Sequence, residues 1–222
     1  MEKKIIFALS VISLVVLFVL ASVYFEDQQT EKIESMAMVD TAVFDRGHSQ
    51  WLGSEEAKVV ITEFFDPGCE TCRAFHPFLL KILSHYDGKT KLVKRYAPLH
   101  LGADKMVMIL EASKQQGKYW ETLDVMFESQ QHWASHSNPQ PENIWQFLPE
   151  TGLDIDKLKA DMSLPEIRGI LQQDMMDAKT LNVRKTPQFF VNGRPLLEFG
   201  DRQLLQLIQS EIDKHYPNQN VN

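Results

Sequence analysis

The sequence predicts an α/β domain with an inserted group of helices, preceded by an N-terminal membrane-spanning helix. Two runs rich in β-branched and aromatic residues, Lys58 to Phe65 and Thr90 to His100, have the composition of buried central strands. Between Gly102 and Leu181, apolar residues recur at helical spacing. Ahead of the domain, Ile5 to Phe25 is an uncharged run of 21 residues, which is long enough to cross a bilayer core as a helix.

Length and charge restrict the function classes. A chain of 222 residues, of which 44% are hydrophobic, can bury one globular core with an elaboration. The formal net charge is -7, and Lys and Arg form no block. Because phosphate binding depends on clustered cations, the sequence predicts no nucleic-acid partner.

The uncharged run predicts an uncleaved signal anchor. It follows Lys3 and Lys4, whose positive charges would stay inside while the rest of the chain is exported. A cleavable signal peptide usually has an apolar core of only about 7–15 residues. Cleavage after Ala21 is the alternative, and it would release a soluble exported protein. The polar residues from Glu26 to Asp40 predict a short tether.

The two cysteines of the chain, Cys69 and Cys72, lie three positions apart. In an oxidising compartment such a pair forms a disulfide, but a bridge that closes so short a loop adds little stability. A zinc site normally needs four ligands, and no second pair of cysteines or histidines stands at ligand spacing. A structural staple and a metal site are the alternatives to a reactive dithiol, which the spacing favours. We predict no metal, and no cofactor apart from the redox-active Cys69–Cys72 disulfide.

The cysteine pair stands at a junction between a strand and a helix. Asp66 to Gly68 interrupts the strand, and the residues from Cys69 to Tyr86 carry apolar side chains at helical spacing. The free N–H groups and the helix dipole at such an end lower a thiol pKa. We therefore predict that Cys69 is the exposed nucleophile and that Cys72, one turn deeper, resolves the mixed disulfide.

Two segments together resemble the DsbA-like branch of the thioredoxin superfamily. They are EFFDPGCETCRAFHP at residues 63–77 and VRKTPQFFVNG at residues 183–193. The resemblance covers nearly all of residues 40–216. It implies a thioredoxin fold with an inserted helical domain, and the activity of a thiol–disulfide oxidoreductase.

The resemblance also implies roles for three residues near the dithiol. Pro187 should follow a cis peptide bond, and the backbone of Thr186 should pair with a substrate strand. Glu63 should be a buried acid that exchanges a proton with Cys72. From the residues alone, the alternatives are an ordinary strand-entry proline at Pro187 and a solvent-facing acid on an edge strand at Glu63.

The predicted organisation ends with a hairpin and a helix. Asn192-Gly193 is a tight-turn signal, and we expect Asp201 to cap the last helix. The predicted boundaries are 1–25 for the signal anchor or signal peptide, 26–40 for the tether, 41–100 for the first part of the thioredoxin fold with the cysteine pair, 101–181 for the helical insertion, 182–216 for the second part with the cis-proline, and 217–222 for a tail.

The dipeptide between the cysteines, Glu70-Thr71, departs from the resemblance. Strongly oxidising members of the branch have a histidine there, which stabilises the thiolate. A carboxylate beside Cys69 disfavours the thiolate by repulsion, which makes the disulfide less oxidising. We therefore predict that Glu70 and Thr71 tune the redox potential, and the direction of electron flow stays open.

The resemblance implies partners and a location. We expect a dithiol oxidase of exported proteins that a DsbB-like membrane protein re-oxidises. It would be anchored in the bacterial inner membrane, with its catalytic domain on the periplasmic side, or be soluble in the periplasm after signal cleavage. The alternatives are a reductase or isomerase kept reduced by a DsbD-like membrane protein, and a non-enzymatic module that handles metals or acts as a chaperone.

Overall fold

The computed structural model describes residues 13–18, 20, 40–135 and 137–217. The chain divides into two units, residues 1–40 and 41–222. In the first unit, residues 13–18 are helical. Within the described residues, no helix combines the length and the hydropathy that a membrane span requires. Most of the predicted anchor and tether, residues 1–40, lies outside the described residues, so both stay predictions.

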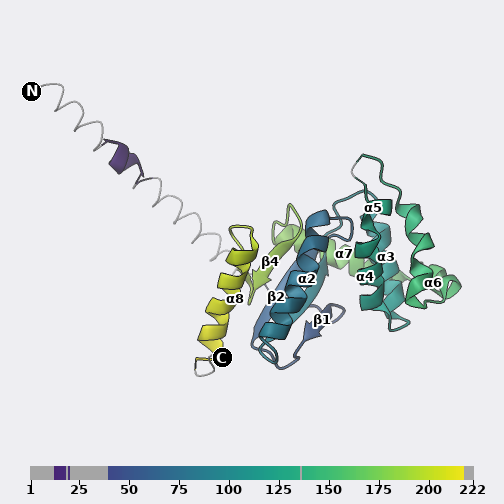
Figure 1. Cartoon of the computed structure of the whole chain (residues 1–222), viewed down its shortest axis with the longest axis horizontal. Coiled ribbons are helices and arrows are strands. Elements are labelled where there is room, and N and C mark those ends of the chain that lie inside the picture. The colour runs from purple at the N-terminus through teal and green to yellow at the C-terminus, as the bar shows by residue number, and fades with distance from the viewer. Residues whose placement is uncertain (1–12, 19, 21–39, 136, 218–222) are drawn as a thin grey trace, which may run out of the picture. The chain divides into compact units, whose positions relative to one another are not determined.

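The second unit is built on a five-stranded sheet with the order β1-β3-β2-β4-β5 (Figure 1). The central strands β2 and β3 are parallel, whereas the pairs β1–β3, β2–β4 and β4–β5 are antiparallel. The strands are β1 (Gln50–Gly53), β2 (Val59–Phe65), β3 (Thr90–Tyr96), β4 (Gln188–Val191) and β5 (Arg194–Pro195).

The central strands follow the prediction, with one change of length. β3 ends at Tyr96 rather than at His100. Pro98 has no amide hydrogen, and the N–H groups of Leu99 and His100 donate to the Asp66 carboxylate instead of continuing the ladder. The sequence prediction omitted β1, which is a short edge strand with alternating exposure.

Two helices pack on the sheet through one apolar cluster. They are α2 (Glu70–His85), which connects β2 to β3, and α8 (Asp201–His215). Leu79 and Ile82 of α2 and Leu204 and Ile208 of α8 share this cluster with buried residues of the strands. The predicted cap of α8 is wrong, because Gly200 is the N-cap residue and Asp201 is the first residue inside the helix.

The segment between β3 and β4 is helical, as its spacing predicts. Figure 1 shows α3 to α6 gathered beside the sheet, on the side away from α8. The cluster that forms their core also contains Phe65, Cys69 and Cys72, so the cysteine pair is packed into the base of the insertion. The elements are α3 (Ala103–Lys114), α4 (Tyr119–Glu128), α5 (Gln130–Trp133), the 3-10 helices η2 (Pro141–Gln146) and η3 (Leu148–Thr151), α6 (Ile155–Asp161) and α7 (Pro165–Thr180).

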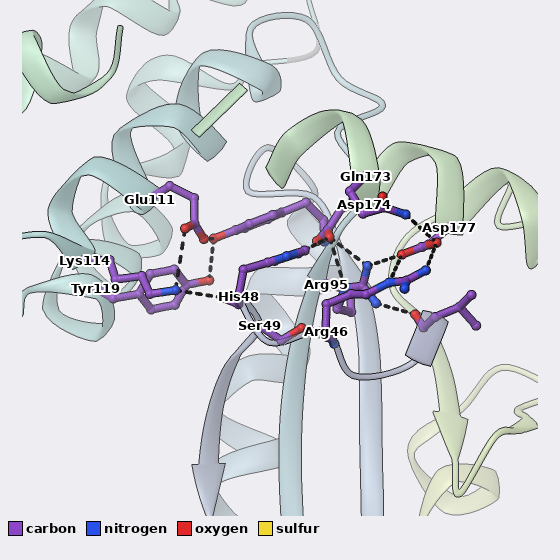
Figure 2. Close-up of polar contacts among 12 residues, drawn as sticks. Arg46, His48, Ser49, Arg95, Glu111, Lys114, Tyr119, Gln173, Asp174 and Asp177 are labelled. Carbon is purple, nitrogen blue, oxygen red and sulfur yellow. Dashed lines mark hydrogen bonds and ion pairs between the residues drawn. The ribbon is translucent and has the colours of Figure 1, made fainter. Parts of the chain in front are cut away.

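A buried ion network ties the start of the domain to β3 and α7 (Figure 2). Arg95 of β3 is fully buried, and its guanidinium donates to Asp174 at 2.7 Å and to Asp177 at 2.6 Å. Arg46 binds Asp177 at 2.8 Å, and Arg95 also donates to the carbonyl of Val43 in the 3-10 helix η1 (Thr41–Val43). Because buried charges are costly when they lose a partner, this network fixes the position of residues 41–49 on the domain.

A second polar cluster continues the network toward α3 and α4 (Figure 2). The Tyr96 hydroxyl donates to Glu111 at 2.6 Å and lies 3.0 Å from the Tyr119 hydroxyl. Lys114 of α3 donates to the carbonyl of His48 at 2.7 Å. The helical insertion is therefore held to the sheet by buried polar contacts as well as by apolar packing.

The C-terminal hairpin is confirmed. Asn192 and Gly193 both have positive φ angles, 48° and 79°, as the tight turns that match the strand twist require. The side chain of Asn192 also accepts from the amide of Val60 at 2.8 Å, which ties the turn to β2.

Candidate functional site

The cysteine pair lies at the N-terminus of α2. Cys69 is the N-cap residue, with extended backbone angles (φ -82°, ψ 120°), and its sulfur accepts a hydrogen bond from the Cys72 amide at 3.4 Å. Asp66-Pro67-Gly68 forms the turn between β2 and α2, and the Cys69 amide donates to the Asp66 carbonyl at 3.0 Å. The positive end of the helix dipole therefore acts on Cys69 Sγ.

Both thiols are buried, which corrects the prediction of an exposed nucleophile. Cys69 is 5% exposed and Cys72 is fully buried. The loop before β4 limits access to Cys69, whose Sγ donates to the Thr186 carbonyl at 3.2 Å. Cys69 is still the more accessible thiol of the two, as the sequence predicts.

The local contacts favour a thiolate at Cys69. A hydrogen bond with the Cys72 side chain lowers the pKa of Cys69 to about 5, well below the ordinary value of a thiol. Burial opposes this shift, whereas hydrogen bonds with the Thr186 side chain and with the backbone of Cys72 and Thr71 support it. At neutral pH, Cys69 is therefore a nucleophile in its ionised form.

The environment of Cys72 has the opposite effect. Burial raises the pKa of Cys72 beyond its ordinary range, and the hydrogen bond with Cys69 and the charge of Glu63 act in the same direction. Two thiols that are three residues apart therefore differ in protonation, because one caps the helix and the other is enclosed by the core.

Glu63 lies inside the sheet rather than at its edge. It belongs to β2, between β3 and β4, and is fully buried, so the alternative of a solvent-facing acid on an edge strand is wrong. Its Oε2 accepts a hydrogen bond from the ammonium group of Lys94, its register partner on β3. Its Oε1 has no hydrogen-bond partner within the described residues. Burial raises the pKa of Glu63, and Lys94 opposes the change.

The loop before β4 brings Thr186 and Pro187 to the dithiol. The peptide bond between them is cis, as the resemblance implies. Pro187 is buried, and Thr186 is half-buried with its carbonyl directed at Cys69 Sγ. The structure therefore brings Cys69, Cys72, Thr186 and Pro187 together.

Two residues that shape the cysteine loop escaped the sequence analysis. The buried carboxylate of Asp66 accepts from the amides of Gly68 at 2.7 Å and His100 at 2.8 Å, and from the His100 ring at 2.8 Å. Gln130 of α5 is 1% exposed and donates to the carbonyls of Pro67 at 2.8 Å and Cys69 at 3.0 Å. An acid beside Pro67-Gly68 is a detectable turn signal, whereas nothing in the local sequence indicates the contact of Gln130.

Lys94 was missed although a signal exists. A lysine in the middle of an otherwise buried strand indicates a buried partner, and Glu63 occupies the equivalent place in β2.

Glu70 and Thr71 lie in the first turn of α2, and both are exposed. The described residues contain no group of three His, Cys, Asp or Glu side chains arranged to hold a metal ion.

Comparison with known proteins decides the family. A thioredoxin family model matches residues 45–210. The chain belongs to the thioredoxin family. Solved structures that carry the names BdbD and alpha-DsbA2 share its fold.

Solved structures are similar to this chain along most of its length. A thioredoxin-like oxidoreductase from Silicibacter pomeroyi is 27% identical, with a TM-score of 0.67, and the match covers 79% of this chain and 98% of that one. The thiol–disulfide exchange protein alpha-DsbA2 from Wolbachia pipientis is 17% identical, with a TM-score of 0.68 and coverage of 83% and 97%. BdbD from Bacillus subtilis is 19% identical, with a TM-score of 0.63 and coverage of 75% and 94%.

Curated relatives are larger proteins. A Na(+)/H(+) antiporter NhaA from Herminiimonas arsenicoxydans is 27% identical over 166 residues, which is 75% of this chain and 26% of that protein. Na(+)/H(+) antiporter NhaA 3 from Salinispora tropica is 30% identical over 165 residues, 73% of this chain and 24% of that protein. The chain thus spans about a quarter of the length of the curated relatives it matches.

Proposed function

We propose that the protein is an extracytoplasmic dithiol oxidase that donates the Cys69–Cys72 disulfide to exported proteins. The proposal rests on the position of Cys69. Its sulfur caps α2 and faces the Thr186 carbonyl, while Cys72 is enclosed directly beneath it. This arrangement presents Cys69 Sγ to a substrate thiolate. It keeps Cys72 in position to attack Cys69 Sγ and restore the Cys69–Cys72 bond.

The proposed exchange proceeds in two displacements. A substrate thiolate attacks Cys69 Sγ, the Cys69–Cys72 bond breaks, and Cys72 leaves as a thiolate. Glu63 supplies the proton that Cys72 requires, since the raised pKa of both groups keeps protons in this enclosed site. A second substrate thiolate then attacks the substrate sulfur of the mixed disulfide, and Cys69 leaves as a thiolate. Two electrons pass from the substrate to the protein, and the substrate gains a disulfide.

The pKa of Cys69 supports the oxidase direction. Thioredoxin, with a thiol pKa of about 7, has a potential of about -270 mV, and DsbA, with about 3.5, has about -120 mV. Cys69, with a pKa of about 5, lies between the two. A more stable thiolate makes the disulfide more oxidising, so we expect a potential between those of thioredoxin and DsbA.

The alternative is a reductase or isomerase, and Glu70 is the observation that favours it. Its exposed carboxylate follows Cys69 directly and opposes the thiolate. In the oxidase proposal a DsbB-like membrane protein removes the electrons, whereas in the alternative a DsbD-like protein supplies them. The reduction potential of the Cys69–Cys72 couple, measured by equilibration with glutathione, distinguishes the oxidase from the reductase. A potential near that of thioredoxin would favour the reductase.

The proposed location follows from residues 1–25. We propose that the uncharged run anchors the protein in the bacterial inner membrane, with the catalytic domain on the periplasmic side. Fractionation of cells, followed by N-terminal sequencing, tests this. The intact chain should be found in the membrane fraction. A mature protein that begins at Ser22 in the soluble periplasm would contradict the anchor and leave export intact.

Trapping tests the proposed exchange itself. Cys72→Ser should accumulate mixed disulfides through Cys69 with exported proteins that contain a disulfide, because the Cys69 thiolate attacks that bond and the resolving thiol is absent. Cys69→Ser, the matched control, should accumulate none. Diagonal gels and mass spectrometry identify the bonded cysteine. Equal trapping by the two variants would refute the assignment of Cys69 as the nucleophile.

A further inference from the structure

A small apolar hollow lies beside the loop that carries Thr186. It has a volume of about 250 Å³, and we call it the Met175 pocket. Its apolar walls come from the segment after β3, from α7 and from the segment before β4: Pro98, Leu99, Met175, Ala178 and Val183. These segments are distant in the sequence and meet only in the fold.

Two side chains of the Met175 pocket are left open to solvent. Leu99 is 55% exposed and Met175 is 48% exposed. Exposed apolar groups gathered around a hollow indicate a binding surface more often than scattered ones do. The volume is below the range of about 300–1,000 Å³ for small-molecule sites, so the pocket suits one side chain rather than a cofactor.

The rim of the Met175 pocket is cationic. Lys179 and Arg184 line it, and neither forms an ion pair with any described residue. Arg184 donates to the neutral side chain of Asn182 at 2.7 Å, and no carboxylate lines the pocket. An acidic group on a ligand would therefore meet two cations without having to displace a carboxylate.

The Met175 pocket and the candidate site share one short segment of the chain. Arg184 precedes Thr186 by two residues, so the two belong to one short segment before β4. The carbonyl of Thr186 lies 3.2 Å from Cys69 Sγ. A polypeptide that pairs with the backbone of Thr186 as an added strand would pass the pocket within a few residues of its reacting cysteine.

We propose that the Met175 pocket is a substrate subsite, which binds an apolar side chain with an acidic neighbour close to the reacting cysteine of an exported polypeptide. The inference rests on the proposed function and narrows its substrate class. The apolar side chain would cover Leu99 and Met175, and the acidic one would pair with Lys179 or Arg184. The reaction is the exchange described above, in which the substrate thiolate attacks Cys69 Sγ and Cys72 leaves.

Single-cysteine peptides test the subsite. The oxidised full-length protein is mixed with peptides that carry Leu-Glu or Ser-Lys near the cysteine, on its N-terminal or its C-terminal side. The rate of reduction of the Cys69–Cys72 bond is divided by the rate with 2-mercaptoethanol, which is too small to reach the pocket. On one of the two sides, Leu-Glu should react about tenfold faster than Ser-Lys.

Charge reversal provides the matched comparison. Lys179→Glu/Arg184→Glu should reduce the preference to about threefold, because the acidic residue then meets like charges. Lys81→Glu, an exposed change on α2, should keep the tenfold preference. Thermal unfolding of each variant verifies the fold.

Two results would overturn the subsite. They are equal normalised rates for both peptides on both sides, and a Lys179→Glu/Arg184→Glu variant that keeps the full preference. In either case the reaction with 2-mercaptoethanol continues, so the proposed function survives. An oxidised protein that reacts with none of the thiols would instead overturn the proposed function, and the subsite with it.

Discussion

At the scale of single residues, the chemistry of the site depends on a contrast between two identical side chains. Cys69 receives an amide hydrogen bond and the helix dipole, whereas Cys72 is enclosed by apolar residues of the insertion and by Glu63. Hydrogen bonding stabilises the first thiolate, and desolvation destabilises the second. The position at the helix start, rather than the residue type, assigns the two roles.

The Glu63–Lys94 pair permits a test that separates stability from proton transfer. Glu63→Gln leaves the Lys94 charge buried without its partner, and we expect it to lower the free energy of unfolding by about 3 kcal/mol. It should also slow the formation of the mixed disulfide, because the leaving Cys72 thiolate loses its proton donor. Denaturant unfolding and quenched-flow kinetics measure the two effects.

A double variant is the control for this prediction. Glu63→Gln/Lys94→Met removes both charges, so it should recover most of the lost stability. Formation of the mixed disulfide should stay slow. If the rate of formation recovers together with stability, Glu63 acts only on the packing of the site.

Glu70 provides a second test at the residue scale. Glu70→His removes the negative charge next to Cys69, so the Cys69 pKa should fall and the couple should become more oxidising. Glu70 is exposed, so solvent screening should keep the change below about 30 mV. Thiolate absorbance and equilibration with glutathione measure both quantities. Unchanged values would show that the dipeptide does not set the potential.

At the scale of elements, the short helix α5 supports the cysteine loop. The Gln130 side chain donates to the carbonyls of Pro67 and Cys69. Gln130→Leu keeps the volume but leaves both carbonyls unpaired, and we expect a loss of about 2 kcal/mol of stability. The Cys69 pKa should rise as the cap loosens, as thiolate absorbance would show. Gln131→Leu, on the exposed side of α5, should leave the pKa unchanged, and an equal shift in both variants would contradict a role for Gln130.

Much of this framework is predictable from local sequence. The strand β2, the helix α2 and the hairpin at Asn192-Gly193 have strong patterns, because apolar periodicity and turn residues act over a few positions. The edge strand β1 has too few residues to show a pattern. The hydrogen bonds of Gln130 cannot be predicted from local sequence for a different reason. Its partners are about sixty residues away, and only the fold brings them together.

At the scale of the whole molecule, the Cys69 thiolate links redox state to stability. The pKa of Cys69 is about 5 in the folded reduced protein and about 8.5 in an unfolded chain. A lowered pKa contributes stability that is fully present above the unfolded value and is lost as the pH falls through the folded one. The raised pKa of Cys72 has an effect only above about pH 8.5.

The reduced protein should therefore gain stability over the oxidised protein as the pH rises from about 5 to 8. Thermal unfolding of both forms at several pH values measures the difference. Cys69→Ala, which has no thiolate, should not show the gain that reduced wild-type protein shows. A difference between the two forms that does not vary with pH would contradict the linkage.

The most direct test of the account is the pH dependence of alkylation in the reduced full-length protein. Iodoacetamide reacts with thiolates, so the rate at each cysteine reports its ionisation. We expect a single transition near pH 5, with the label on Cys69 and almost none on Cys72 by mass spectrometry of peptides. A transition near pH 8.5, or equal labelling of the two cysteines, would contradict the assignment of Cys69 as the activated nucleophile.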